Sequence, residues 1–151
     1  MKAYTDIEQS KKLAEILPIE SADMWWLYVT SQGKHIAMMY EEPDPHYLAR
    51  MESYGIKNAA IPCWSLAALL GLIKSEIYGE NVYGDTVTYK VNFRKYKFTD
   101  DIDLYQIAYG NYKWHEDGSN SWKDMVNTGE KENLIDAAFE MVVWLKENNK
   151  I

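Results

Sequence analysis

An uninterrupted apolar run occupies residues 66–73, near the middle of the chain. The run contains no charged or polar side chain, so a helix formed here lacks the polar stripe of a surface helix. It is also much shorter than the ~20 residues that a membrane-spanning helix needs. Ser65, directly before the run, belongs to a residue type that caps helix N-termini. We therefore expect a buried central helix with the other elements packed around it.

Two longer helices are predicted, one near each end of the sequence. Residues 5–17 carry apolar side chains at helical spacing, and Thr5 and Glu8 have the spacing of a capping box. Pro18 ends this helix, because the residue before a proline disfavours helical backbone angles. Residues 132–148 form the last predicted helix, whose polar stripe is narrow for a surface helix.

Apolar and alternating segments predict two hairpins. Residues 24–29 and 35–40 are rich in residue types that favour strands, and Gly33 lies in the turn between them. Residues 87–93 alternate apolar and polar side chains, which is typical of a half-buried strand. Residues 104–112 form the returning strand of this second hairpin.

Three other segments carry weaker signals. Asp44 followed by Pro45 has the form of a helix N-cap and first helical position, which predicts a short helix with a loop as the alternative. The alternation of the 87–93 strand breaks near Lys95, so we expect a bulge or a bend there. Residues 115–129 are rich in Gly, Ser, Asn and Asp, and we expect an irregular excursion that Trp122 pins to the body.

The order of these elements predicts the fold class. Helices at the N-terminus, middle and C-terminus are separated by hairpins with short turns. This order favours a single α+β domain over residues 1–151. We expect an antiparallel sheet of four to five strands with the helices packed mainly on one face.

The strand at residues 24–29 is apolar at successive positions. Because successive side chains on a strand point to opposite faces, Trp25 and Trp26 cannot enter the same core. One of them and its neighbours would form a large exposed apolar patch, which monomers rarely tolerate. We therefore predict a partner surface formed by Trp25, Trp26, Tyr28, Met38, Tyr40 and Trp144.

A symmetric homodimer is the first partner that this surface predicts, and a different protein is the second. The alternative is that the loops at residues 41–60 and 115–129 fold back over the open face. Tyr and Trp are frequent at interfaces because they combine a large apolar area with a polar group. The chain has 12 Tyr and 6 Trp against 3 Phe, which favours a partner surface.

Charge and cysteine content restrict the kinds of partner and compartment. The net charge is −7, with 11 acidic and 7 basic residues in residues 1–80 and 12 and 9 in residues 81–151. This even acidity argues against nucleic-acid binding, which needs a basic patch. A single cysteine, no signal-peptide pattern and no membrane-length apolar segment predict a cytoplasmic protein without a membrane contact.

Residue types able to carry chemistry are few and scattered. Cys63 lies at the entrance of the apolar run, where a free cysteine is usually an inert apolar side chain rather than a nucleophile. His35, His46 and His115 lack the spacing of a metal motif. Carboxylates lie near His46 and His115 in the sequence and could join them as metal ligands, but such residues are far more often solvated loop charges. We predict no catalytic residue, no metal and no cofactor.

Three stretches together resemble a known group of proteins. They are residues 21–26 (SADMWW), residues 61–70 (IPCWSLAALL) and residues 136–148 (DAAFEMVVWLKEN). In this pattern the chain resembles, from end to end, small uncharacterised proteins encoded in prophages and mobile elements of gut Bacteroidales. The resemblance implies an accessory protein, and it provides no catalytic residue to carry over.

Three functions are compatible with these patterns. The first is a non-enzymatic accessory or interaction module of a mobile element. The alternative is a small enzyme or small-molecule binder with a cleft lined by Tyr and Trp. The weakest is an acidic decoy of a nucleic-acid-binding enzyme, since a decoy would concentrate its acids on one face.

Overall fold

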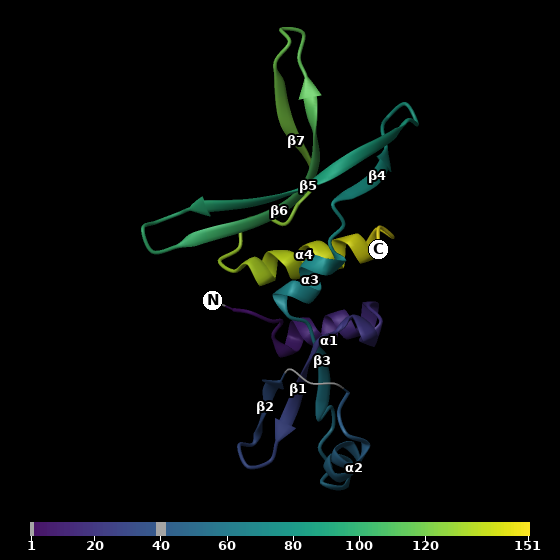
Figure 1. Ribbon diagram of the computed structural model, residues 1–151, viewed down its shortest axis with the longest axis vertical. Coiled ribbons are helices and arrows are strands. Elements are labelled where there is room, and N and C mark those ends of the chain that lie inside the picture. Colours follow the sequence, from purple (N-terminus) through teal and green to yellow (C-terminus); the bar gives the residue numbers. More distant parts are fainter. Residues whose placement is uncertain (1, 39–41) are drawn as a thin grey trace. The chain divides into compact units, whose positions relative to one another are not determined.

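The computed structural model describes residues 2–38 and 42–151 and confirms the α+β class (Figure 1). Helices lie near the N-terminus, in the middle and at the C-terminus of the chain. The α-helices are α1 (Ile7–Ile16), α2 (Pro45–Ser53), α3 (Leu66–Leu72) and α4 (Leu134–Glu147), with a short 3-10 turn η1 (Ile19–Ser21) after α1. The strands are β1 (Met24–Val29), β2 (Lys34–Met38), β3 (Ala60–Cys63), β4 (Glu76–Glu80), β5 (Thr86–Lys97), β6 (Asp103–Trp114) and β7 (Asn120–Asn127).

The strands form two antiparallel sheets rather than the one sheet of four to five strands that we expected. Their orders are β2-β1-β3 and β4-β5-β6-β7. The chain divides into two compact units, Lys2–Leu70 and Gly71–Ile151, and each unit contains one of the sheets. The prediction of a single domain stays a prediction.

The first helix begins one residue later than its capping pattern predicted. The Asp6 carboxylate accepts a hydrogen bond from Gln9 N at 2.8 Å, and Gln9 Oε1 accepts one from Asp6 N at 3.2 Å. The capping box is therefore Asp6 and Gln9, and the prediction of Thr5 and Glu8 was wrong. Thr5 is fully buried, and its hydroxyl instead accepts a hydrogen bond from Trp64 N at 3.1 Å.

The next two helices begin where their caps predicted. Asp44 accepts a hydrogen bond from His46 N at 2.8 Å, and Pro45 is the first residue of α2. Ser65 Oγ accepts one from Ala68 N at 3.1 Å at the start of α3. Leu69 in α3 is fully buried, but Ala67 is exposed, so this helix is not buried on every side.

The second sheet is an antiparallel meander. Val91 pairs with Tyr109 and Phe93 with Ile107, so the predicted alternation marks one face of the sheet. Helix α4 packs against β6, where Ile107 and Tyr109 are fully buried. The Tyr109 hydroxyl donates a hydrogen bond to the carbonyl of Lys74.

Two expectations about this sheet were wrong. Strand β5 runs through Lys95 in regular register to its last pair, Lys97 with Asp103, and the irregularity lies instead between Tyr109 and Gly110. The polar segment 115–129 is not an excursion, because residues 120–127 form β7. Its polar side chains are compatible with a strand that has solvent on one side.

Candidate interaction surface

Strand register determines which of the aromatic residues share a face. Trp25 on β1 lies opposite Met38 on β2 and Pro62 on β3. Directly opposed residues of antiparallel strands point to the same face of a sheet. The face that contains Trp25, which we call the outer face, is formed by Trp25, Leu27, Val29, Lys34, Ile36, Met38, Ala60 and Pro62.

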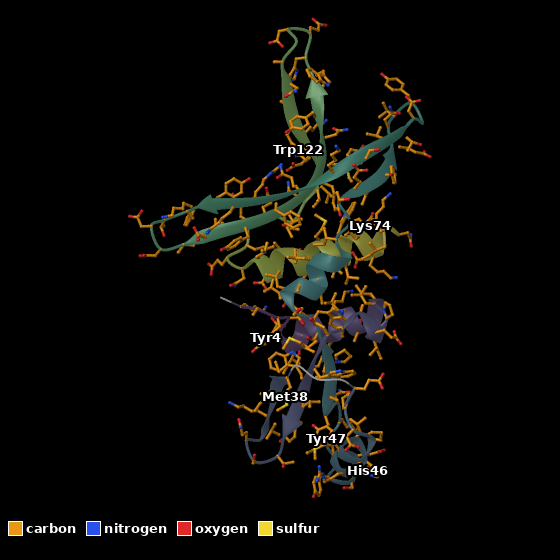
Figure 2. All side chains as sticks on the ribbon, in the orientation of Figure 1. Tyr4, Met38, His46, Tyr47, Lys74 and Trp122 are labelled. Atoms are coloured by element: carbon orange, nitrogen blue, oxygen red, sulfur yellow. The ribbon has the colours of Figure 1, made fainter. Side chains whose placement is uncertain are left out.

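The opposite, inner face is covered by the segment that leads into α1. Met24, Ile61 and Cys63 lie on the inner face and are buried. The indole N–H of Trp26 donates to the Thr5 carbonyl at 3.1 Å. The ring of Trp26 also meets the ring of Tyr4 edge to face, with centroids 5.5 Å apart. Tyr4 is labelled in Figure 2.

The outer face has no buried side chain, whereas part of the inner face is buried. None of its seven apolar side chains is buried, although each is partly covered. Its single charged residue, Lys34, is exposed and lies at the end of β2 that is nearest the turn. An apolar centre with its charge at the rim is the composition of a protein–protein interface.

The six residues predicted as a partner surface do not form one patch. Trp25 and Met38 are cross-strand partners on the outer face, whereas Trp26 and Tyr28 lie on the inner face. Tyr40 lies outside the described residues. Trp144 is a half-buried residue of α4, in the other compact unit.

Sequence reasoning missed most of the outer face. Leu27, Val29, Ile36, Ala60 and Pro62 belong to it, but the prediction named none of them. Period-two alternation from Trp25 would have selected Leu27 and Val29. Ala60 and Pro62 had no such signal, because a proline within a short segment argues against a strand.

Cys63 is a core residue of the N-terminal unit. It is fully buried, and its Sγ lies 3.6 Å from both the hydroxyl and the carbonyl oxygen of Thr5. Burial raises the pKa of the Cys63 thiol, which disfavours the nucleophilic thiolate. The Thr5 hydroxyl also contacts Ser10 Oγ at 2.8 Å, so this polar cluster satisfies itself.

The three histidines lie at separate places. A ring nitrogen of His35 lies 2.8 Å from the Asn58 carbonyl, and one of His115 lies 2.7 Å from Ser121 Oγ. His46 is exposed in the first turn of α2 (Figure 2). Within residues 2–38 and 42–151, no group of three or more His, Cys, Asp or Glu has the arrangement of a metal site.

A polar network ties three strands of the second sheet together. Arg94 on β5 donates to both carboxylate oxygens of Asp124 on β7 and, at 2.9 Å, to Gln106 Oε1 on β6. The Trp122 indole donates to Asp124 at 2.6 Å. The hydrogen bond from Arg94 is the main reason that the pKa of Asp124 lies below its ordinary value. Since these groups satisfy one another, we interpret the network as structural.

Comparisons of this chain with models of protein families, with curated proteins and with solved structures found no match. In the described part of the chain, no helix combines the length and the apolar character needed to cross a membrane.

Proposed function

We propose that this chain is a non-enzymatic interaction module that self-associates through the outer face of its N-terminal sheet. The observation that carries the proposal is the contrast between the two faces of one sheet. The inner face buries Met24, Ile61 and Cys63, whereas the outer face has seven apolar side chains and buries none of them. Covering such a face removes apolar area from water, which favours association.

The low charge of the outer face favours a second copy of the chain as its partner. The outer face offers a partner one charge, Lys34, and therefore fits a surface that is itself apolar. In a two-fold contact the same face meets itself in inverted orientation. Where the two-fold axis crosses the strands, the two Lys34 side chains lie at opposite ends of the contact and do not repel each other.

Paired isoleucine substitutions test this proposal. Ile36→Lys places a charge in the outer face on edge strand β2, and we expect it to abolish self-association. Ile19→Lys makes the same change at a side chain that is 49% exposed outside the face, and should leave self-association intact. Size-exclusion chromatography with light scattering measures the mass, and circular dichroism checks that both variants fold. Equal behaviour of the two variants would contradict the proposal.

An accessory role in a mobile element belongs to the same proposal. It is supported by the resemblance of residues 21–26, 61–70 and 136–148 to prophage-encoded proteins.

A tyrosine-lined groove favours small-molecule binding as a second candidate function. This groove, of about 290 Å³, lies between the end of β1 and α2 and is lined by Tyr28, Val29, Thr30, Tyr47, Arg50, Met51 and Tyr54. The Tyr47 hydroxyl donates to the carbonyls of Tyr28 and Ala59, so its ring is held in place. Aromatic walls beside one guanidinium suit an aromatic carboxylate.

Benzoate titrated into the protein tests this second function. Chemical shifts of Tyr54 and Arg50 should move with saturation, and Arg50→Gln should weaken the binding. Shifts that do not saturate, or that persist unchanged in Arg50→Gln, would exclude a specific site.

The charge distribution does not support the decoy hypothesis, because the two units carry similar net charges. Residues 2–70 have 9 acids and 6 bases, and residues 71–151 have 14 and 10.

A further inference from the structure

The C-terminal sheet forks at one end. Strand β5 pairs with β6 from Lys97 only as far as Lys90, which lies opposite Gly110. Beyond that pair, residues 86–89 of β5 pair with β4 alone, and residues 111–114 of β6 pair with β7 alone. The β4–β5 and β6–β7 hairpins therefore diverge, as Figure 1 shows.

Both inner edges of this fork have unpaired backbone groups. Residues of a strand direct their N–H and C=O groups alternately to the two sides. Val91 N donates to Ser75 O, which lies just before β4. The backbone N–H and C=O groups of Thr88 and Thr86 therefore point away from β4, into the fork. His115 N donates to Ser119 O, which lies just before β7. The backbone N–H and C=O groups of Trp114 and Tyr112 therefore point away from β7, also into the fork. In the described residues, neither edge has a partner strand.

A groove of about 410 Å³ follows the fork. Its lining residues are Asn81, Val87, Tyr89, Asn111, Lys123, Asp124 and Met125. Val87, Tyr89 and Met125 supply an apolar wall. Lys123 lies opposite Asn111 in the β6–β7 register, and it forms no ion pair with any residue that the structure describes. The groove thus offers a cation to a partner that brings a carboxylate.

We propose that this fork binds an extended segment of a partner protein, which adds a strand to one of the two inner edges. Unpaired strand edges are templates for such pairing, and main-chain hydrogen bonds supply much of the affinity. Side chains two residues apart on the added strand share a face. The segment therefore carries a carboxylate for Lys123 and, two residues away, an apolar side chain that packs against Val87 and Tyr89.

This site is independent of the self-association proposed above. It lies in residues 71–151, whereas the outer face lies in residues 2–70. Ile36→Lys should abolish self-association and leave peptide binding at the fork unchanged, so failure of one proposal does not imply failure of the other.

A labelled strand peptide tests the proposal. The probe is acetyl-Thr-Glu-Thr-Val-Thr-Val-Thr-amide with a fluorophore, which places Glu and both Val residues on one face. Fluorescence anisotropy should show saturable binding. Lys123→Glu should weaken the binding by about tenfold, since the pair becomes repulsive. Replacing Glu by Lys in the peptide should restore binding to this variant, which a misfolded protein could not do.

Two controls make the outcome decisive. Lys74→Glu makes the same charge change just before β4 starts, away from the fork, and should bind the original probe normally (Figure 2). Amide exchange at Thr86 and Thr88, or at Tyr112 and Trp114, should slow by about tenfold or more in the complex, because these amides become hydrogen-bonded. Binding that survives N-methylation of the peptide backbone, or Lys123→Glu, would overturn the proposal, as would the absence of binding at millimolar probe.

Discussion

Trp25 lies directly opposite Met38 on the outer face of the N-terminal sheet, while its neighbour Trp26 points inward and donates its indole N–H to the Thr5 carbonyl. Adjacent tryptophans therefore have different roles. Trp26 holds the segment before α1 against the sheet, and Trp25 contributes to a face that remains partly in contact with solvent.

Matched substitutions separate these two roles. Trp26→Phe removes the indole donor and leaves the Thr5 carbonyl with only the weak thiol donor of Cys63, so we expect the free energy of unfolding to fall by about 1–3 kcal/mol. Trp25→Phe keeps an aromatic ring on the outer face and should cost less than about 1 kcal/mol. Urea unfolding at a concentration below self-association measures both. A cost for Trp25→Phe equal to that of Trp26→Phe would contradict this assignment.

The Arg94–Asp124 pair predicts a loss of stability in acid. The pKa of Asp124 is lowered from 3.8 in the folded chain, mainly by the hydrogen bond from Arg94. The ionised Asp124 carboxylate therefore stabilises the fold fully above pH 3.8. This contribution is lost as the pH falls through the lowered pKa of the folded chain. Asp124→Asn should cost about 1–3 kcal/mol at neutral pH and flatten the acid limb of the stability curve.

Thermal unfolding across the acid range measures this effect. Asp100→Asn, in an exposed turn, is the control for loss of a carboxylate and should retain the acid dependence of the wild type. An unchanged acid limb in Asp124→Asn would show that the network does not carry the pH dependence.

Local signals predicted the elements whose determinants are close in sequence. The cap of α2 at Asp44, the cap of α3 at Ser65 and the alternation from Val87 to Phe93 all depend on neighbours within a few residues. Thr5 was misassigned because its hydroxyl bonds to Trp64 N, 59 residues away, and no local pattern shows that contact.

Pairing between distant strands determined the rest. The polar composition of residues 120–127 predicts a loop. They form strand β7 instead, where a polar residue such as Asp124 is satisfied by Arg94 from β5, which is distant in sequence. The outer face depends on the register of β1 with both β2 and β3, and β3 contains Pro62. The inner edges of the fork depend on where the β5–β6 pairing ends, which no composition signal marks.

Gly110 is predicted to be intolerant of any side chain. A Cβ atom there would lie 2.3 Å from the Lys123 carbonyl oxygen and 2.7 Å from Trp122 Nε1, so strand β7 would have to shift. Gly110→Ala should lower the free energy of unfolding by about 1–3 kcal/mol.

Gly71 provides the matched control, since a Cβ atom there meets nothing within 4 Å. Gly71→Ala lies in α3 and should be neutral or stabilising by up to about 1 kcal/mol. Chemical denaturation of both variants measures the difference. Equal effects at the two glycines would contradict the packing described for Trp122.

Cys63 should be unreactive while the chain is folded. It is fully buried and burial raises its thiol pKa, so both access and thiolate content are low. A chromogenic disulfide reagent should react with less than one thiol per chain in buffer and with one in guanidinium chloride. Fast reaction of the folded chain would show that Cys63 is accessible.

Self-association through the outer face is the central claim, and sedimentation equilibrium of the wild-type chain tests it most directly. At micromolar to ~100 micromolar concentrations, we expect a reversible shift toward twice the 17.6 kDa mass of the chain, because the seven apolar residues of the face become covered. A single species of 17.6 kDa across the whole range would contradict the claim.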